Sequence, residues 1–110
     1  MSDLTAKEIF EKHIPERLSS KPDVVEAINN SYQFDLAGDG GGKWVVDLTE
    51  PGGKVSEGEK EDPGVTVSMA ASDFVALVEG KLNAQMAFLQ GKLKIKGDMS
   101  LALKLQQVLG

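Results

Sequence analysis

The sequence contains no cysteine, one histidine, and only four phenylalanines, one tyrosine and one tryptophan. The absence of cysteine excludes disulfide scaffolds, thiolate metal sites and thiol catalysis. Long hydrophobic runs are also missing, because the longest stretches without charge, 63–72 and 82–91, have ten residues each. A membrane-spanning helix needs about 20 apolar residues. The chain does not open with a basic segment followed by an apolar one, as a secretion signal does, and we therefore expect a cytoplasmic protein.

Positive charge is scarce as well. The chain has 12 basic and 17 acidic side chains, which gives a net charge of -5. This net charge argues against a nucleic-acid-binding protein, because binding to phosphate requires a positive surface. The distribution is uneven: residues 1–63 hold 14 acidic and 7 basic side chains, and residues 64–110 hold 3 and 5. Only the second half has a net positive charge, which favours contact with an anionic surface. Its basic residues are Lys81, Lys92, Lys94, Lys96 and Lys104. These lysines form either an ordinary solvated face or a site of transient contact with anionic membranes.

The 110 residues suit a single domain, 1–110, and the hydrophobic share of 41% is ordinary for a globular protein. The pattern predicts a helix over 3–19, interrupted at Pro15, and a short helix over 23–28. Alternating apolar residues predict strands over 32–36, 44–48, 54–56, 65–69 and 92–96. Further helices are predicted after the capping residues Ser72, Asn83 and Asp98. Tight turns between the first three strands imply an antiparallel meander, so we expect an α+β domain with one sheet covered by helices.

No set of residues supports catalysis or metal binding. His13 has no serine, cysteine or carboxylate partner at a recognised catalytic spacing. The glycine-rich segment 38–42 departs from phosphate-, dinucleotide- and calcium-binding loops at essential positions and is typical of a hairpin turn. The acidic segment 57–62 lacks the aromatic flanks of a glycosidase pair and is expected to be a solvated loop. We therefore expect no enzyme activity, no metal and no cofactor.

The last third of the chain has an excess of apolar residues. Segments 84–89 and 101–109 are apolar on nearly all sides of the helices they are expected to form. A small domain with one sheet has no third layer in which to bury both faces of such helices. Two interpretations stay open at this point: plain core packing, and a hydrophobic ligand sheltered between helices and sheet.

Several segments resemble the sterol carrier protein 2 family. Residues 44–48 are similar to the second-strand motif of that family, residues 72–74 and 80–99 to its most characteristic stretch, and residues 101–106 extend the match. The resemblance covers nearly the whole chain and is weaker in the first helix and the acidic segment. It implies a five-stranded, mostly antiparallel sheet covered on one side by helices, with an apolar tunnel between sheet and helices.

The resemblance also implies a non-catalytic intracellular protein that binds and transfers fatty acids, fatty acyl-CoA, phospholipids or sterols. The residues expected to line the tunnel are Phe34, Trp44, Phe74, Leu77, Val78, Met86, Phe88, Leu89, Met99, Leu103 and Leu105. Gln85 and Gln106 match polar positions near the family's cavity and are expected to orient the polar end of a ligand. The alternative function is an interaction module that docks a partner protein through an exposed apolar groove.

Overall fold

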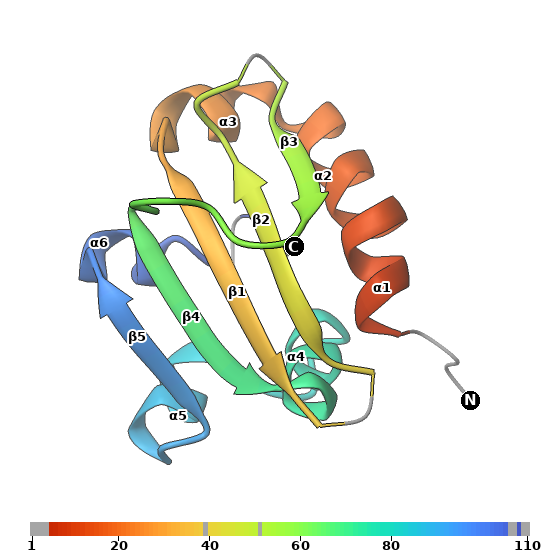
Figure 1. Ribbon diagram of the computed structural model, residues 1–110, viewed down its shortest axis with the longest axis vertical. Helices are drawn as coiled ribbons and strands as arrows, with labels where there is room; N and C mark the ends of the chain where they lie inside the picture. Colours follow the sequence, from red (N-terminus) through yellow and green to blue (C-terminus); the bar gives the residue numbers. More distant parts are fainter. Residues whose placement is uncertain (1–4, 39, 51, 106–107, 109–110) are drawn as a thin grey trace.

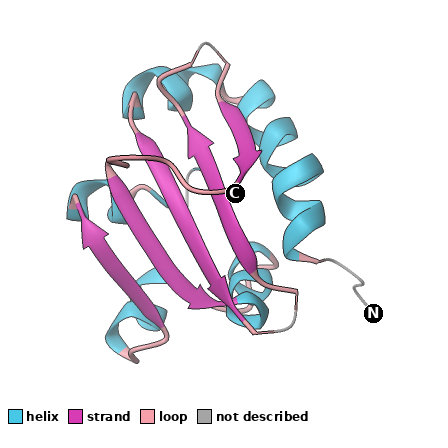
Figure 2. Ribbon diagram, viewed as in Figure 1, coloured by secondary structure: helices cyan, strands magenta, loops and turns pink. Residues whose placement is uncertain are grey.

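A five-stranded sheet forms the centre of the molecule (Figures 1 and 2). The computed structural model describes residues 5–38, 40–50, 52–105 and 108. The strands are β1 (Ser31–Ala37), β2 (Gly42–Asp47), β3 (Lys54–Glu57), β4 (Val65–Ala70) and β5 (Leu93–Gly97). Their spatial order is β3-β2-β1-β4-β5, in which β1 and β4 are parallel and the other neighbours are antiparallel. The α+β class and the three-strand meander are confirmed, and the sheet is mixed because of its one parallel pair.

The first helix is continuous but changes its hydrogen-bonding pattern midway. It consists of α1 (Ala6–Glu8), a π-helical segment η1 (Ile9–His13) and α2 (Ile14–Ser20). The amide of Ile14 donates to the carbonyl of Ile9, five residues earlier. Pro15 has no N–H to donate to the preceding turn, and this accounts for a change of pattern at this point. The predicted interruption is therefore a widened turn within one helix.

Four shorter helices follow among the described residues: α3 (Pro22–Ile28), α4 (Ala71–Val78), α5 (Ala84–Leu89) and α6 (Met99–Leu103). Two predicted caps are confirmed. The Asn83 side chain accepts hydrogen bonds from the first turn of α5, and the Asp98 side chain accepts one from the amide of Ser100 in α6. The prediction for Ser72 was wrong, because α4 begins directly after β4 and Ala70 occupies the capping position without a side-chain bond.

One face of the sheet packs against the helices. The strand side chains that point to this face are buried and apolar, including Phe34, Val46 and Val67. Phe10 from η1 stacks between Trp44 and Phe74, with ring centroids 4.9 and 5.0 Å apart. These rings, together with Phe34, fill the space between the first helix, α4 and the sheet.

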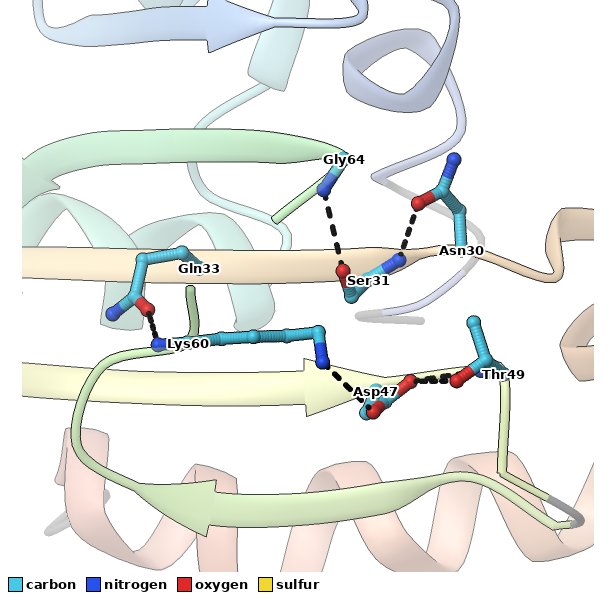
Figure 3. A network of polar contacts seen from close by, with 7 residues as sticks. All are labelled: Asn30, Ser31, Gln33, Asp47, Thr49, Lys60 and Gly64. Atoms are coloured by element: carbon cyan, nitrogen blue, oxygen red, sulfur yellow. Dashed lines mark hydrogen bonds and ion pairs between the residues drawn. The ribbon is translucent and has the colours of Figure 1, made fainter. Parts of the chain in front are cut away.

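The opposite face of the sheet is crossed by the segment that connects β3 to β4, seen in green in front of β2 and β1 in Figure 1. Buried Gln33 holds this segment: its Oε1 accepts from the amide of Lys60 at 2.7 Å, and its Nε2 donates to the carbonyl of Gly58 at 3.1 Å. Ser31 accepts from the amide of Gly64 at 3.2 Å (Figure 3). The acidic side chains of 57–62 are exposed as expected, but the backbone is fixed to the sheet.

Candidate functional site

An apolar groove lies between α5, β5 and α6, at the edge of the sheet where Figure 1 shows α5 and α6 near opposite ends of β5. Its volume is about 230 Å³. The lining residues are Asn83, Ala84, Gln85, Phe88, Leu93, Ile95, Met99, Ala102, Leu103 and Leu105. None of them carries a charge, and only Asn83 and Gln85 present polar side chains.

Each wall of the groove is positioned by a local feature of the sequence. On α5, fully buried Ala87 faces the core, which leaves neighbouring Phe88 at the groove. On β5, alternation turns Leu93 and Ile95 toward the helices, where they pair with Met69 and Val67 of β4. These contacts fix two sides of the groove to the sheet.

The third wall, α6, is anchored through one buried residue. The side chain of Leu101 is buried, and its carbonyl accepts a 2.5 Å hydrogen bond from the hydroxyl of Tyr32 in β1. With Leu101 turned inward, Met99 and Leu103 are left on the outside, with exposed fractions of 46% and 75%.

The exposed large apolar side chains are concentrated on the two helices that flank this groove. Every large hydrophobic residue that is exposed in the described part of the chain belongs to α5 or α6. They are Met86, Phe88, Leu89, Met99 and Leu103. A cluster of this kind on one side of a small protein marks a surface that binds an apolar partner or ligand.

The electrostatics favour binding over chemistry. The groove lining contains no titratable group, so it offers no general acid, base or nucleophile. Asn83 uses its side-chain oxygen to cap α5 by accepting from the backbone amides of Gln85 and Met86, whereas the side-chain carboxamide of Gln85 forms no hydrogen bond with any described residue. Gln85 is therefore the side chain available to meet the polar end of a ligand.

Two titratable groups support α6 without entering the groove. Hydrogen bonds from Ser100 lower the pKa of the Asp98 carboxyl, with a smaller contribution from Lys104. Burial raises the pKa of the Tyr32 phenol, and the charge of Asp98 raises it further. The phenol is therefore protonated at neutral pH, as its hydrogen bond to Leu101 requires.

Five of the predicted site residues line the groove: Gln85, Phe88, Met99, Leu103 and Leu105. Phe34, Trp44, Phe74 and Leu77 lie in the core instead, and Val78 is half-buried against it. Met86 and Leu89 lie on α5 outside the groove lining, and Gln106 falls outside the described residues. Whether the five contact a ligand stays a prediction.

The predicted tunnel between sheet and helices is absent from the described part of the structure. The physical reason is Phe10, whose ring occupies the space between Trp44 and Phe74. The structure has an open groove at the β5 edge instead.

Five groove residues were missed by the sequence analysis: Asn83, Ala84, Leu93, Ile95 and Ala102. The alternation of apolar residues with lysines along 92–96 could have identified Leu93 and Ile95, because it turns both away from the charged face. Ala84 and Ala102 carry no comparable signal, since small residues suit any face of a short helix.

Two wider depressions are more open to solvent than the groove. One, of about 470 Å³, lies on the face that carries Asp35, Lys43 and Lys94, and the other, of about 690 Å³, lies between η1 and β3. Within the described ranges, no group of three or more acidic or histidine side chains is placed to hold a metal ion. Nor does any described helix have the length and apolar character needed to cross a membrane.

Residues 11–110 match the SCP-2 sterol transfer family. The chain belongs to this family. An SCP-2 domain is a lipid-binding domain, and among the described residues the exposed large apolar side chains all lie on the two helices that flank the groove.

Among curated proteins, the SCP-2 domain is 49% identical over 92 residues to hydroxysteroid dehydrogenase-like protein 2 of Mus musculus and 48% identical to that of Homo sapiens. Each match covers 83% of this chain, but only 19% of the mouse protein and 22% of the human one. The chain therefore spans about a fifth of the length of these relatives, and their name describes a much longer protein.

Solved structures of other SCP-2 domains have the same fold. The apo form of sterol carrier protein 2 from Yarrowia lipolytica superposes with a TM-score of 0.73 at 30% identity, covering 93% of this chain and 81% of that one. A palmitated SCP2L2 from Aedes aegypti superposes with a TM-score of 0.67 at 29% identity, covering 96% and 95%.

Proposed function

We propose that this SCP-2 domain binds the acyl chain of a fatty acid or a related lipid in the groove between α5, β5 and α6. The observation that supports the proposal is an uncharged groove at the only place in the described structure where large apolar side chains are exposed. Gln85, at the rim, is the side chain proposed to meet the polar end of the lipid.

The size of the groove favours a chain over a fused ring system. Pockets for compact, drug-sized ligands have volumes of roughly 300–1,000 Å³, and this groove, at about 230 Å³, is smaller. A flexible chain can enter a narrow groove progressively, whereas a sterol must fit as one rigid body. The palmitated relative from Aedes aegypti supports the same choice. Acyl-CoA, phospholipids and sterols remain candidates for the same binding assay.

The expected affinity suits a carrier. Each buried methylene contributes about 0.8 kcal/mol, so a chain of about 16 carbons gains at most about 13 kcal/mol. Lost freedom of the ligand costs on the order of 4–15 kcal/mol. Binding in the micromolar range follows when the chain is largely covered, and a lipid held that weakly can be released to an acceptor.

We propose no catalytic activity for this domain, because its groove lining provides no titratable side chain. The dehydrogenase-like name of the mouse and human relatives belongs to proteins about four times as long. Transfer of the lipid between donor and acceptor, and a cytoplasmic location, stay predictions.

Two neighbouring residues on α5 provide the test. Phe88 lines the groove, whereas Leu89 is 73% exposed and lies outside the lining. In a displacement assay with a fluorescent fatty acid, Phe88→Glu should weaken binding by at least roughly tenfold, because it places a charge against the chain. The matched control, Leu89→Glu, should bind within about twofold of the unaltered protein. The lack of saturable binding below about 100 μM would contradict the proposal.

A protein-docking function is the second candidate, favoured by the high exposure of Leu89 and Leu103. In that case Leu89→Glu would disrupt a complex detected by size-exclusion chromatography, while fatty acid binding would be weak in the unaltered protein. The two candidate functions therefore differ in what they predict for Leu89→Glu. If the domain binds lipid, this variant keeps its fatty acid affinity; if the domain docks a protein, this variant loses the complex.

A further inference from the structure

The face of the sheet away from the helices carries two oppositely charged regions side by side. The acidic segment 57–62, which contains four carboxylates and one lysine, crosses this face over β2 and β1. Beside it, β4 and β5 are uncovered on the same face (Figure 1). The only charged side chains of these two strands are Lys94 and Lys96. One half of the face is therefore negative and the other half positive.

The sheet register determines which side chains form the positive half. Lys96 pairs with Thr66 of β4, and Lys94 pairs with Ser68. Val67, between Thr66 and Ser68, is buried against the helices, so alternation turns these four side chains to the opposite face. We call them the basic strip. Its β4 members are small, so a second polypeptide can approach the strip closely.

The acidic segment and the basic strip do not neutralise each other within one chain. Lys94 and Lys96 are exposed, and neither forms an ion pair with a described residue. Among the carboxylates of the acidic segment, Glu59 alone is paired within the described ranges, with Lys43. Both regions are therefore free to meet charges of the opposite sign, and a second copy of this chain offers both.

The strand order allows a second copy to match both regions at once. In the order β3-β2-β1-β4-β5, the acidic segment covers β2 and β1, and the basic strip lies on β4 and β5. Each region is two strands, or about 10 Å, wide. A two-fold axis in the plane between two facing sheets, parallel to the strands and between β1 and β4, places each acidic segment over the other copy's basic strip. An axis in that plane perpendicular to the strands would bring acidic segments together instead.

The level along the strands agrees with the same axis. The acidic segment is held at Gln33, whose side chain bonds to the backbone of Lys60 and Gly58 (Figure 3). Gln33 pairs with Thr66, which pairs with Lys96. Rotation about an axis parallel to the strands preserves this level, so the segment of one copy meets Thr66 and Lys96 of the other.

We propose that this domain forms a symmetric dimer in which the acidic segment of each copy packs on the basic strip of the other. The interface is isologous, because each copy contributes the same two regions. The dimer goes beyond lipid binding and leaves the groove on the helix side open in both copies. Exposed ion pairs carry the contact, so the dimer is weak and salt weakens it further.

The experiment is sedimentation velocity over a concentration series at low and high salt. At low salt the dimer fraction of the unaltered protein should rise with concentration, and high salt should reduce it. Lys94→Glu with Lys96→Glu should weaken self-association by at least roughly tenfold, because like charges then face each other. Glu59→Lys with Glu61→Lys should weaken it equally for the same reason. Circular dichroism confirms that each variant is folded.

An equimolar mixture of these two double variants gives the sharpest test. One variant has an acidic strip beside its acidic segment, and the other has a basic segment beside its basic strip. In a heterodimer of the two, both contacts again join opposite charges. The mixture should therefore dimerise within about threefold of the unaltered protein, although each variant alone stays monomeric.

The matched control is Lys7→Glu with Lys12→Glu, which reverses the same charge on the exposed face of the first helix. It should self-associate within about twofold of the unaltered protein. A monomer at every concentration in low salt, an equal loss in the control, or a mixture that stays monomeric would overturn the proposal. So would a dimer that Leu89→Ser dissociates and the charge reversals do not, since the copies would then meet through α5.

The fatty acid displacement assay separates this proposal from the proposed function. None of the reversed residues lines the groove, so the fatty acid affinity of each variant should be unaltered. Self-association without fatty acid binding would contradict the proposed function and leave the dimer standing. Fatty acid binding by a protein that is monomeric at every concentration would do the reverse.

Discussion

The hydroxyl of Tyr32 donates a 2.5 Å hydrogen bond to the carbonyl of Leu101, and through it the central strand β1 holds the helix that forms one wall of the groove. The two residues are 69 positions apart in the sequence. The tyrosine side chain is fully buried, so water cannot replace the bond if it is lost. The position of α6 therefore depends on a contact far from the groove opening.

Tyr32→Phe should destabilise the protein by about 1–3 kcal/mol, because the carbonyl of Leu101 loses its partner inside the protein. Urea unfolding followed by tryptophan fluorescence measures this change. Ser20→Ala is a suitable control, since the Ser20 hydroxyl bonds to the carbonyl of Glu16 at an exposed position. The control should change the stability by less than about 0.5 kcal/mol. Equal effects of the two substitutions would contradict a special role for Tyr32.

Alkaline pH should reduce the contribution of the same tyrosine. Burial and the nearby Asp98 raise the pKa of the Tyr32 phenol above its unfolded value of about 10. Above this value the unfolded chain has released a proton that the native protein still holds, so the free energy of unfolding falls as the pH rises. The stability advantage over Tyr32→Phe should be complete below about pH 10 and shrink above it. Unfolding of both proteins at about pH 9 and about pH 11 measures the difference, and a constant difference would refute the assignment.

The strands were predictable because their signal is local. Alternation places Tyr32, Phe34 and Leu36 on one face whatever the neighbouring strand is, and two short turns then bring β2 and β3 alongside in order. The parallel pairing of β1 with β4 was not predicted. It depends on the crossing segment held by Ser31 and Gln33, which in the sequence are simply two polar residues at outward positions.

The groove was predicted only in part, because helices that are apolar on all sides do not reveal which face points inward. The expected tunnel walls Phe34 and Trp44 face the helices, and Phe74 of α4 meets Phe34, but the first helix brings Phe10 into contact with all three. The sequence shows that Phe10 is apolar and not which ring it will meet. Its contacts with these three rings come from long-range packing, which the local pattern of apolar residues does not reveal.

Phe10→Ala should test whether that side chain closes the interior. Removing the ring leaves a cavity between Trp44 and Phe74 and should cost about 3–5 kcal/mol of stability. If the cavity connects with the groove, the variant should bind longer acyl chains more tightly than the unaltered protein does. Displacement assays across a series of fatty acid lengths measure this dependence.

The milder variant Phe10→Leu serves as a second test in case Phe10→Ala does not fold, because leucine retains most of the apolar volume. It should show a smaller loss of stability and a smaller gain for long chains. An unchanged length dependence in both variants, with both folded, would show that the interior and the groove are independent.

The cap of α5 offers a last prediction about the groove. Asn83 Oδ1 accepts hydrogen bonds from the amides of Gln85 at 2.8 Å and Met86 at 3.3 Å, which fixes the first turn of the helix that carries Phe88. Asn83→Ala should destabilise the protein by about 1 kcal/mol and weaken fatty acid binding by severalfold, because α5 frays at the groove. Asn83→Ser can still cap the helix and should restore most of both properties. If the serine variant recovers stability but not affinity, Asn83 acts on the ligand through its own amide, and its importance would not lie in the cap.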